Sequence, residues 1–157
     1  MVENIEKSQK IEKIKNGTVI DHIKAGKALI VLKILGVDGS NGELITMGIN
    51  VKSSKAGKKD IIKFENVFLN EHDVNKIALI SPSSTINIIK DTQVVEKFTV
   101  EPPARVDFVK CPNQNCISNQ GEPVNPTFDV ISKTPLKVQC AYCDRILYGD
   151  EVMAFTF

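Results

Sequence analysis

Four cysteines, all beyond residue 110, constrain this chain more than any other feature of its sequence. They form a C-x4-C pair at Cys111 and Cys116, then 23 intervening residues, then a C-x2-C pair at Cys140 and Cys143. Two such pairs, each on a tight turn, can place four thiolates at the corners of a tetrahedron, the geometry of structural zinc. Four thiolates leave no position open for a reactive water, so we expect one structural zinc ion per chain.

Three other interpretations of the cysteines compete with zinc. Iron in a rubredoxin-like site is the main rival, although such sites usually use C-x2-C on both sides. Four reduced thiols in a small core would leave the paired spacing unexplained. A thioredoxin-like role for Cys140-Ala-Tyr-Cys143 would leave the other pair unused and lacks a βαβ context.

A domain of about 50 residues buries little apolar surface, and zinc binding of about 10–16 kcal/mol would supply the missing stability.

A proline pair divides the chain. Pro102 and Pro103 donate no backbone hydrogen bonds and favour extended conformations before them. The cysteine-bearing part begins directly afterwards. We therefore predict one domain over residues 1–101 and a second over residues 102–157.

The first domain has the sequence pattern of an α+β fold. Strands are predicted at residues 17–23, 44–51, 60–65, 85–89 and 93–100, helices at 25–35 and 71–80, and a polar loop at 52–59. This β-α-β-β-α-β-β order indicates a ferredoxin-like antiparallel sheet with an extra strand and both helices on one face. The second domain is predicted to be small and all-β, with short strands at 136–139 and 152–157 and no helix.

Composition argues against several classes of partner. The net charge is +1, which provides no broad basic field for nucleic acid. The longest apolar stretch, from Ala28 to Leu35, is interrupted by Lys33 and is far shorter than the roughly 20 residues of a membrane span. The polar N-terminus does not resemble a secretory signal. We expect a cytoplasmic protein without a membrane or nucleic-acid partner.

Polar residues on the predicted strands are candidates for an anion site. The chain has no P-loop and no G-x-G-x-x-G, so any nucleotide site must use isolated side chains. Five polar residues on these strands could meet at one edge of the predicted sheet: Asp21, His22, Lys63, Asn87 and Lys97. The same residues could equally be ordinary solvent-facing side chains. A nucleotide-directed enzyme would need a general base, and only His22 is available there.

Several stretches together resemble one known family. They are Gly17-Thr-Val-Ile-Asp-His-Ile23, Met47-Gly-Ile-Asn50, residues 59–66, Ser84-Thr-Ile-Asn87, residues 111–118 and Cys140-Ala-Tyr-Cys143. From about Ile11 onward, the chain resembles the regulatory chain of aspartate carbamoyltransferase.

The resemblance implies a non-catalytic regulatory subunit in pyrimidine biosynthesis. In that family the N-terminal domain binds the effectors ATP, CTP and UTP, and the zinc domain contacts the catalytic chain. Regulatory chains form homodimers, and three dimers bridge two catalytic trimers in the holoenzyme. The alternative from residue patterns alone is a zinc-ribbon module that binds nucleic acid.

Carried over by position, the resemblance also implies an effector site. Lys63 would contact the base, Asp21 and Lys97 the ribose, and His22 and Lys97 the phosphates. Lys13 would add a further cation. The complete implied set is Ile11, Lys13, Ile14, Val19, Asp21, His22, Lys63, Asn87, Ile89, Val94 and Lys97.

Overall fold

The first of two β-sheets confirms the predicted ferredoxin-like arrangement. The computed structural model describes residues 13–54 and 57–157. Five antiparallel strands follow the order β2-β3-β1-β4-β5. Their bounds are β1 (Gly17–Lys24), β2 (Ile45–Ser53), β3 (Gly57–Glu65), β4 (Thr85–Lys90) and β5 (Gln93–Thr99). The fifth strand extends the sheet beside β4, as the sequence pattern predicted.

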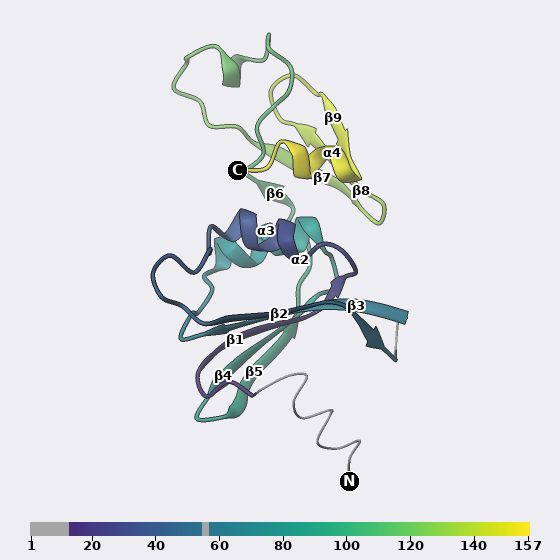
Figure 1. Cartoon of the computed structure of the whole chain (residues 1–157). Coiled ribbons are helices and arrows are strands. Elements are labelled where there is room, and N and C mark those ends of the chain that lie inside the picture. The colour runs from purple at the N-terminus through teal and green to yellow at the C-terminus, as the bar shows by residue number, and fades with distance from the viewer. Residues whose placement is uncertain (1–12, 55–56) are drawn as a thin grey trace.

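Two helices, α2 (Ala28–Leu35) and α3 (Glu71–Ile80), cover one face of this sheet (Figure 1). The first ends at Gly36, whose φ of 69° is a left-handed conformation that glycine adopts without strain. The second begins with a capping box. Asn70 Oδ1 accepts the Asp73 amide at 2.8 Å, and Asp73 Oδ2 accepts the Asn70 amide at 3.2 Å.

Alternation along the strands separates a buried face from an open one. Ile20, Ile62 and Ile86 are register partners on three central strands, and all three are fully buried beneath the helices. Helix residues Val31 and Ile77 complete this core. Because successive residues of a strand point to opposite faces, the residues directly before and after each isoleucine on its own strand lie on the face without helices.

The second sheet contains four strands in the order β6-β7-β8-β9. They are β6 (Arg105–Val106), β7 (Phe128–Lys133), β8 (Leu136–Cys140) and β9 (Ile146–Tyr148), with the short 3₁₀ helix η1 (Ile117–Asn119) between the first two. The predicted strand at 136–139 lies within β8. The core beneath this second sheet includes Phe128, Val138 and Leu147, all nearly inaccessible to solvent.

Two predictions about local structure were wrong. Residues 149–154 form helix α4 (Gly149–Ala154), not part of a strand at 152–157. Asp150 and Glu151 in its first turn suit the helix dipole, and Val152 packs into the core, while Thr156 makes one isolated bridge to Val109. The predicted loop at 52–59 is shorter than expected, because β2 extends to Ser53 and β3 begins at Gly57.

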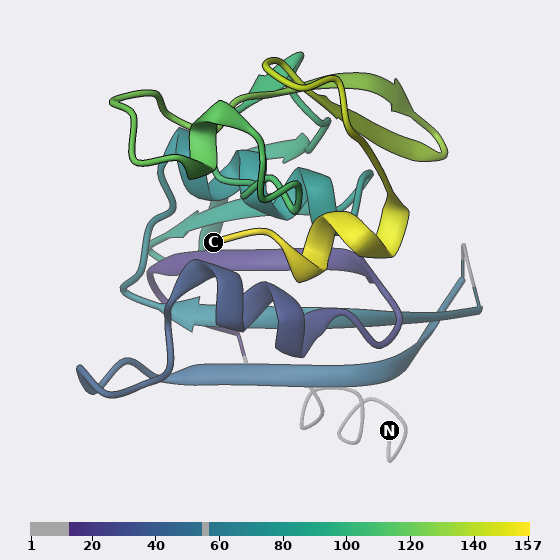
Figure 2. The same ribbon diagram turned by 90° about the horizontal axis from the view of Figure 1, so that it is seen from above.

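The cysteine-bearing part rests on the helix layer, away from the open face of the first sheet (Figure 1, Figure 2). Leu79 of α3 is buried within the C-terminal core, and Met153 of α4 packs against the N-terminal core. The helices therefore lie between the first sheet and the second part of the chain. Among the described residues, no helix is long and apolar enough to cross a membrane.

Candidate functional site

The four cysteines converge on one point in the C-terminal part. Their sulfur atoms all lie within 4.8 Å of one another, and the Cys111–Cys143 and Cys116–Cys140 sulfur pairs are 3.6 and 3.7 Å apart. A tetrahedron with Zn–S bonds of about 2.3 Å has edges of about 3.8 Å. The cluster therefore fits one zinc ion held by all four thiolates.

Tight turns hold each cysteine pair in this geometry. In the first, the carbonyl of Asn113 accepts the Cys116 amide at 3.0 Å, and its side-chain oxygen accepts the Asn115 amide at 3.0 Å. The side-chain Nδ2 of Asn119 donates to the Cys111 carbonyl at 2.8 Å. In the second, the Cys140 carbonyl accepts the Asp144 amide at 3.1 Å. These bonds orient the ligands from outside the coordination sphere.

The surroundings of the thiols make a bound cation necessary for a fully ionised cluster. Burial raises the pKa of Cys111 and of Cys140. Burial also opposes ionisation of Cys143, but hydrogen bonds from the Asn113 side chain and the Arg145 amide lower its pKa to about 7. Since zinc binds thiolates, the ion would stabilise the charges that burial disfavours. With four sulfur ligands its role is structural.

The open face of the first sheet gathers several residues of the expected effector site. Val19 on β1 pairs with Lys63 on β3 and with Asn87 on β4, and Asn87 pairs with Lys97 on β5. The four residues thus form one row across four strands. Lys63 is 7% exposed, whereas Lys97 at the edge strand is exposed. The row presents two amino groups and one amide on a single surface.

A β-bulge in β1 shapes one side of this row. The register with β3 shifts between Ile20 and Ile23, and His22 has a φ of 55°. Asp21 Oδ1 accepts the His22 amide at 2.7 Å, and the His22 Nε2 atom is 3.8 Å from Asp21 Oδ2. Burial acts to raise the pKa of Asp21, but the Lys59 ammonium and the His22 amide outweigh it and the pKa is lowered. Lys59, together with the His22 amide at the bulge, therefore favours the ionised form of this carboxylate beside the row.

Sequence reasoning missed one cation at this site. Lys59 Nζ lies 2.8 Å from Asp21 Oδ1, and the Lys59 side chain is largely buried. Residues 59, 61 and 63 alternate on β3, so Lys59 shares the face of Lys63. This period-two spacing is the signal that could have identified it.

The remaining expected residues lie on the side of the row away from Asp21. Ile89 is buried and pairs with Gly17 and with the exposed Val94. Lys13 is exposed and Ile14 half-buried, and the following Lys15 accepts the Thr92 amide at 2.9 Å, which places this segment against the β4–β5 turn. Ile11 lies outside the described residues. The assignment of these side chains to a nucleotide stays a prediction.

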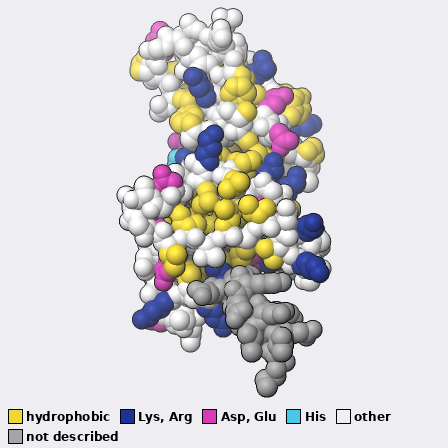
Figure 3. All heavy atoms as spheres, viewed as in Figure 1, with side chains coloured by type: hydrophobic (Ala, Val, Ile, Leu, Met, Phe, Trp, Pro, Cys, Tyr) yellow, Lys and Arg dark blue, Asp and Glu magenta, His cyan; other side chains and the backbone are white. Residues whose placement is uncertain are grey.

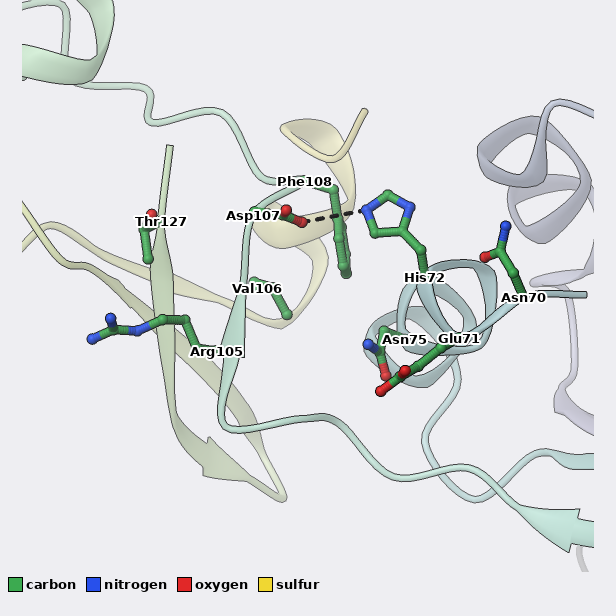
Figure 4. Close-up of a pocket in the computed structure, with 9 residues that line it drawn as sticks. All are labelled: Asn70, Glu71, His72, Asn75, Arg105, Val106, Asp107, Phe108 and Thr127. Atoms are coloured by element: carbon green, nitrogen blue, oxygen red, sulfur yellow. Dashed lines mark hydrogen bonds and ion pairs between the residues drawn. The ribbon is translucent and has the colours of Figure 1, made fainter. Parts of the chain in front are cut away.

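A separate cavity of about 650 Å³ lies where α3 meets the start of the C-terminal part (Figure 4). His72 Nε2 is 3.3 Å from Asp107 Oδ1, and the His72 ring packs edge-on against Phe108. None of the cavity's lining residues belongs to the expected effector or metal sites. They are Asn70, Glu71, His72, Asn75, Arg105, Val106, Asp107, Phe108 and Thr127. This cavity marks a contact between the two parts of the chain.

Comparison with known proteins identifies both parts. A family model described as aspartate carbamoyltransferase regulatory chain, allosteric domain, matches residues 9–101, and the metal binding domain of the same chain matches residues 105–153. Relatives with the name aspartate carbamoyltransferase regulatory chain occur in several organisms. That of Thermofilum pendens is 54% identical over 145 residues, covering 91% of each chain. That of Thermococcus kodakarensis is 52% identical over 144 residues, covering 91% of this chain and 94% of the relative. That of Pyrococcus horikoshii is 52% identical over 147 residues, covering 92% and 96%. The chain therefore belongs to the aspartate carbamoyltransferase regulatory chain family.

Proposed function

We propose that this protein is the non-catalytic regulatory subunit of aspartate carbamoyltransferase and that it binds nucleotide effectors on the open face of its first sheet. The observation that carries the proposal is the cross-strand row of Lys63, Val19, Asn87 and Lys97, flanked by Asp21, within a domain that matches an allosteric family model. Isolated cations beside one carboxylate suit a ligand that carries both phosphates and ribose hydroxyls.

The effectors are CTP, UTP and ATP, and each part of the nucleotide has a partner in the row or directly beside it. Lys63 contacts the base, Asp21 and Lys97 contact the ribose, and Lys97 and His22 contact the phosphates. Lys59 holds the Asp21 carboxylate at 2.8 Å and so fixes its orientation toward the sugar. The site requires no helix N-terminus or glycine-rich loop, since these side chains supply the charge.

The two domains have separate roles: residues 1–101 bind the effector, and residues 102–157 contact the catalytic chain. The zinc site supports the second role, because four metal ligands, three of them buried, make a small domain rigid enough to present a fixed surface. Tyr142 and Ile117, beside the cysteine turns, are 42% and 46% exposed and offer apolar area for such a contact. Four thiols that bind a metal also suit a reducing compartment, which favours the cytoplasm.

Two regulatory chains associate through their N-terminal domains, and three such dimers join two catalytic trimers. An apolar surface over α2 and the edge strand β2 supports this association (Figure 3). Leu29 on α2 and Ile49 on β2 are 60% and 42% exposed, and Leu44, directly before β2, is 59% exposed. An edge strand beside an apolar helix is a surface that soluble proteins usually cover.

The proposal is tested by mixing the zinc-loaded chain with a catalytic trimer from the same source. We expect a mass corresponding to six chains of each kind and an activity that changes on addition of CTP. Lys63→Ala should weaken CTP binding and leave assembly intact. Lys58→Ala is the matched control, because Lys58 lies on the same strand with the opposite alternation. Unchanged CTP affinity in Lys63→Ala would show that the effector site has been misplaced.

A further inference from the structure

Asp60 is a fully buried carboxylate that lies outside the expected effector site. Its Oδ2 atom accepts the amides of Gly26 and Ala28 at 2.8 and 3.0 Å, and its Oδ1 atom accepts the amide of Asn50 at 2.9 Å. One side chain on β3 thus holds both the start of α2 and the strand β2. A buried carboxylate is costly unless it is satisfied in this way.

The backbone around Asp60 is irregular on both neighbouring strands. The register between β1 and β3 shifts between Ile20 and Ile23, and the register between β2 and β3 shifts between Gly48 and Val51. Asn50, which donates to Asp60, has a φ of 59°. Bulges of this kind re-aim side chains and interrupt the ladder. Asp60 therefore links two places where the sheet departs from regular pairing.

Asp60 and its predecessor act on opposite faces of the sheet. Lys59 forms its ion pair with Asp21 on the open face, whereas Asp60 bonds to the first turn of α2 on the helix-covered face. The two residues are covalent neighbours on a strand, so a displacement of one backbone segment moves both.

The turn that Asp60 holds also contacts the metal-binding domain. Lys27 lies between the two amides bound by Asp60, and its Nζ atom is 3.4 Å from Asp150 Oδ1 and 3.7 Å from Met153 Sδ of α4. The Lys27 side chain is only 19% exposed. A second bond, from the Lys24 amide to Ser81 Oγ at 2.9 Å, anchors the same turn to the end of α3.

We propose that Asp60 is a positioning residue that transmits nucleotide occupancy from the Asp21–Lys59 pair, through the turn before α2, to the Lys27–Asp150 contact with the metal-binding domain. The inference rests on the proposed function and goes beyond it by assigning the route of the signal. Nucleotide that engages Asp21 alters its pairing with Lys59, and Asp60 carries the resulting shift of β3 to the other face. The resulting movement of the turn changes the distance between Lys27 Nζ and its partners on α4, Asp150 and Met153.

The test compares three variants in the assembled holoenzyme. Asp60→Asn keeps the shape but replaces one accepting oxygen with a donor that faces a backbone amide. Lys27→Met keeps the side-chain length and removes the charge that meets Asp150. Asp73→Asn is the matched control, because Asp73 also accepts a backbone amide at a helix start but lies in α3. CTP affinity of the free regulatory chain and the change in holoenzyme activity with CTP are measured for each.

We expect Asp60→Asn and Lys27→Met to bind CTP within about threefold of the wild-type affinity and to lose at least half of the CTP response, because coupling and binding are separable quantities. Asp73→Asn should keep the full response. Hydrogen exchange should also quicken at residues 26–28 and in α4 of Asp60→Asn without nucleotide. A structural defect alone would lower stability without separating affinity from response.

Several results would overturn the inference. A full CTP response in Asp60→Asn or in Lys27→Met excludes the route, as does an equal loss in the Asp73→Asn control. Loss of CTP binding in Asp60→Asn would place that residue in binding instead of transmission. If Asp60→Asn does not fold, Lys27→Met decides by the same criterion. Failure of the wild-type chain itself to bind CTP or to assemble would instead refute the proposed function.

Discussion

Leu79 allows the contact between the two parts of the chain to be measured. It belongs to α3 of the first domain, yet its side chain is 2% exposed and lies in the C-terminal core. Leu79→Ala removes three carbons, worth about 2.4 kcal/mol at about 0.8 kcal/mol per buried CH₂. The cavity left behind raises the expected loss to about 3–5 kcal/mol. Most of that loss should fall on the metal-binding domain.

The chain provides separate signals for its two parts. Both tyrosines, Tyr142 and Tyr148, lie in the metal-binding domain, and the chain has no tryptophan. Tyrosine fluorescence during urea unfolding therefore reports that domain, while far-UV circular dichroism reports the whole chain. We expect Leu79→Ala to lower the fluorescence midpoint more than the dichroism midpoint.

Ile77→Ala is the control for this measurement. Ile77 lies on the same helix and is equally buried, but it packs in the N-terminal core. Its truncation should lower the dichroism midpoint more than the fluorescence midpoint, the reverse of Leu79→Ala. Equal shifts of both midpoints in both variants would refute the assignment of Leu79 to the second core.

Three further predictions concern the metal, pH and the backbone. Chelation of zinc should unfold the metal-binding domain and leave the first sheet intact, because the metal contributes about 10–16 kcal/mol to the small domain. The tyrosine fluorescence transition should then disappear from the urea titration, while the far-UV dichroism transition of the first sheet remains. The pKa of Asp21 is lowered from its ordinary value of 3.8, so its stabilising contribution is full above that pH and is lost as the pH falls through the lower folded-state value. The unfolding free energies of wild type and Asp21→Asn should accordingly converge below pH 3.8, and a constant difference would contradict this. Gly17→Ala should cost at least about 2 kcal/mol by thermal unfolding, because Gly17 has a φ of 145° and an added Cβ would lie 1.9 Å from the Phe64 carbonyl oxygen. An unchanged melting temperature would show that β1 can shift to relieve the contact.

Local patterns predicted what depends on a single element. Alternation along strands identified the sheet, and cysteine spacing identified the metal ligands. The predicted end of the first helix at residue 35 and the predicted start of the second at residue 71 agree with the structure, where Gly36 ends α2 and Asn70 caps α3, because such residues meet backbone requirements of the helix itself. Likewise, the order of elements was sufficient for the ferredoxin-like topology, since short connections leave few alternatives.

Features that depend on tertiary contact were harder to find. Leu79 follows Ile77 by two residues, about 200° around the helix, so its burial requires a second partner on the far side of α3. Asp60 reads as an ordinary polar residue of a strand until its three backbone donors are known. The helix α4 has only six residues, and its apolar positions fit a short strand equally well. Leu79 and α4 belong to the junction between the two domains, and Asp60 holds the turn from which Lys27 contacts α4.

The strengths of the contacts indicate where an allosteric change can occur. Coupling between sites is typically about 1–3 kcal/mol, far less than the energy that a structural zinc ion contributes to a small domain. The metal-binding domain should therefore move as a rigid body. The Lys27–Asp150 ion pair and the His72–Asp107 side-chain contact each have at least one largely exposed partner, and such surface contacts are worth at most about 1 kcal/mol each. They can break and re-form within the energy that an effector supplies, and both lie where the helix layer meets the metal-binding domain. A signal that begins on the open face thus needs only to reach one of these pairs, and Lys27, held between the amides that Asp60 accepts, is the one connected to it through the sheet.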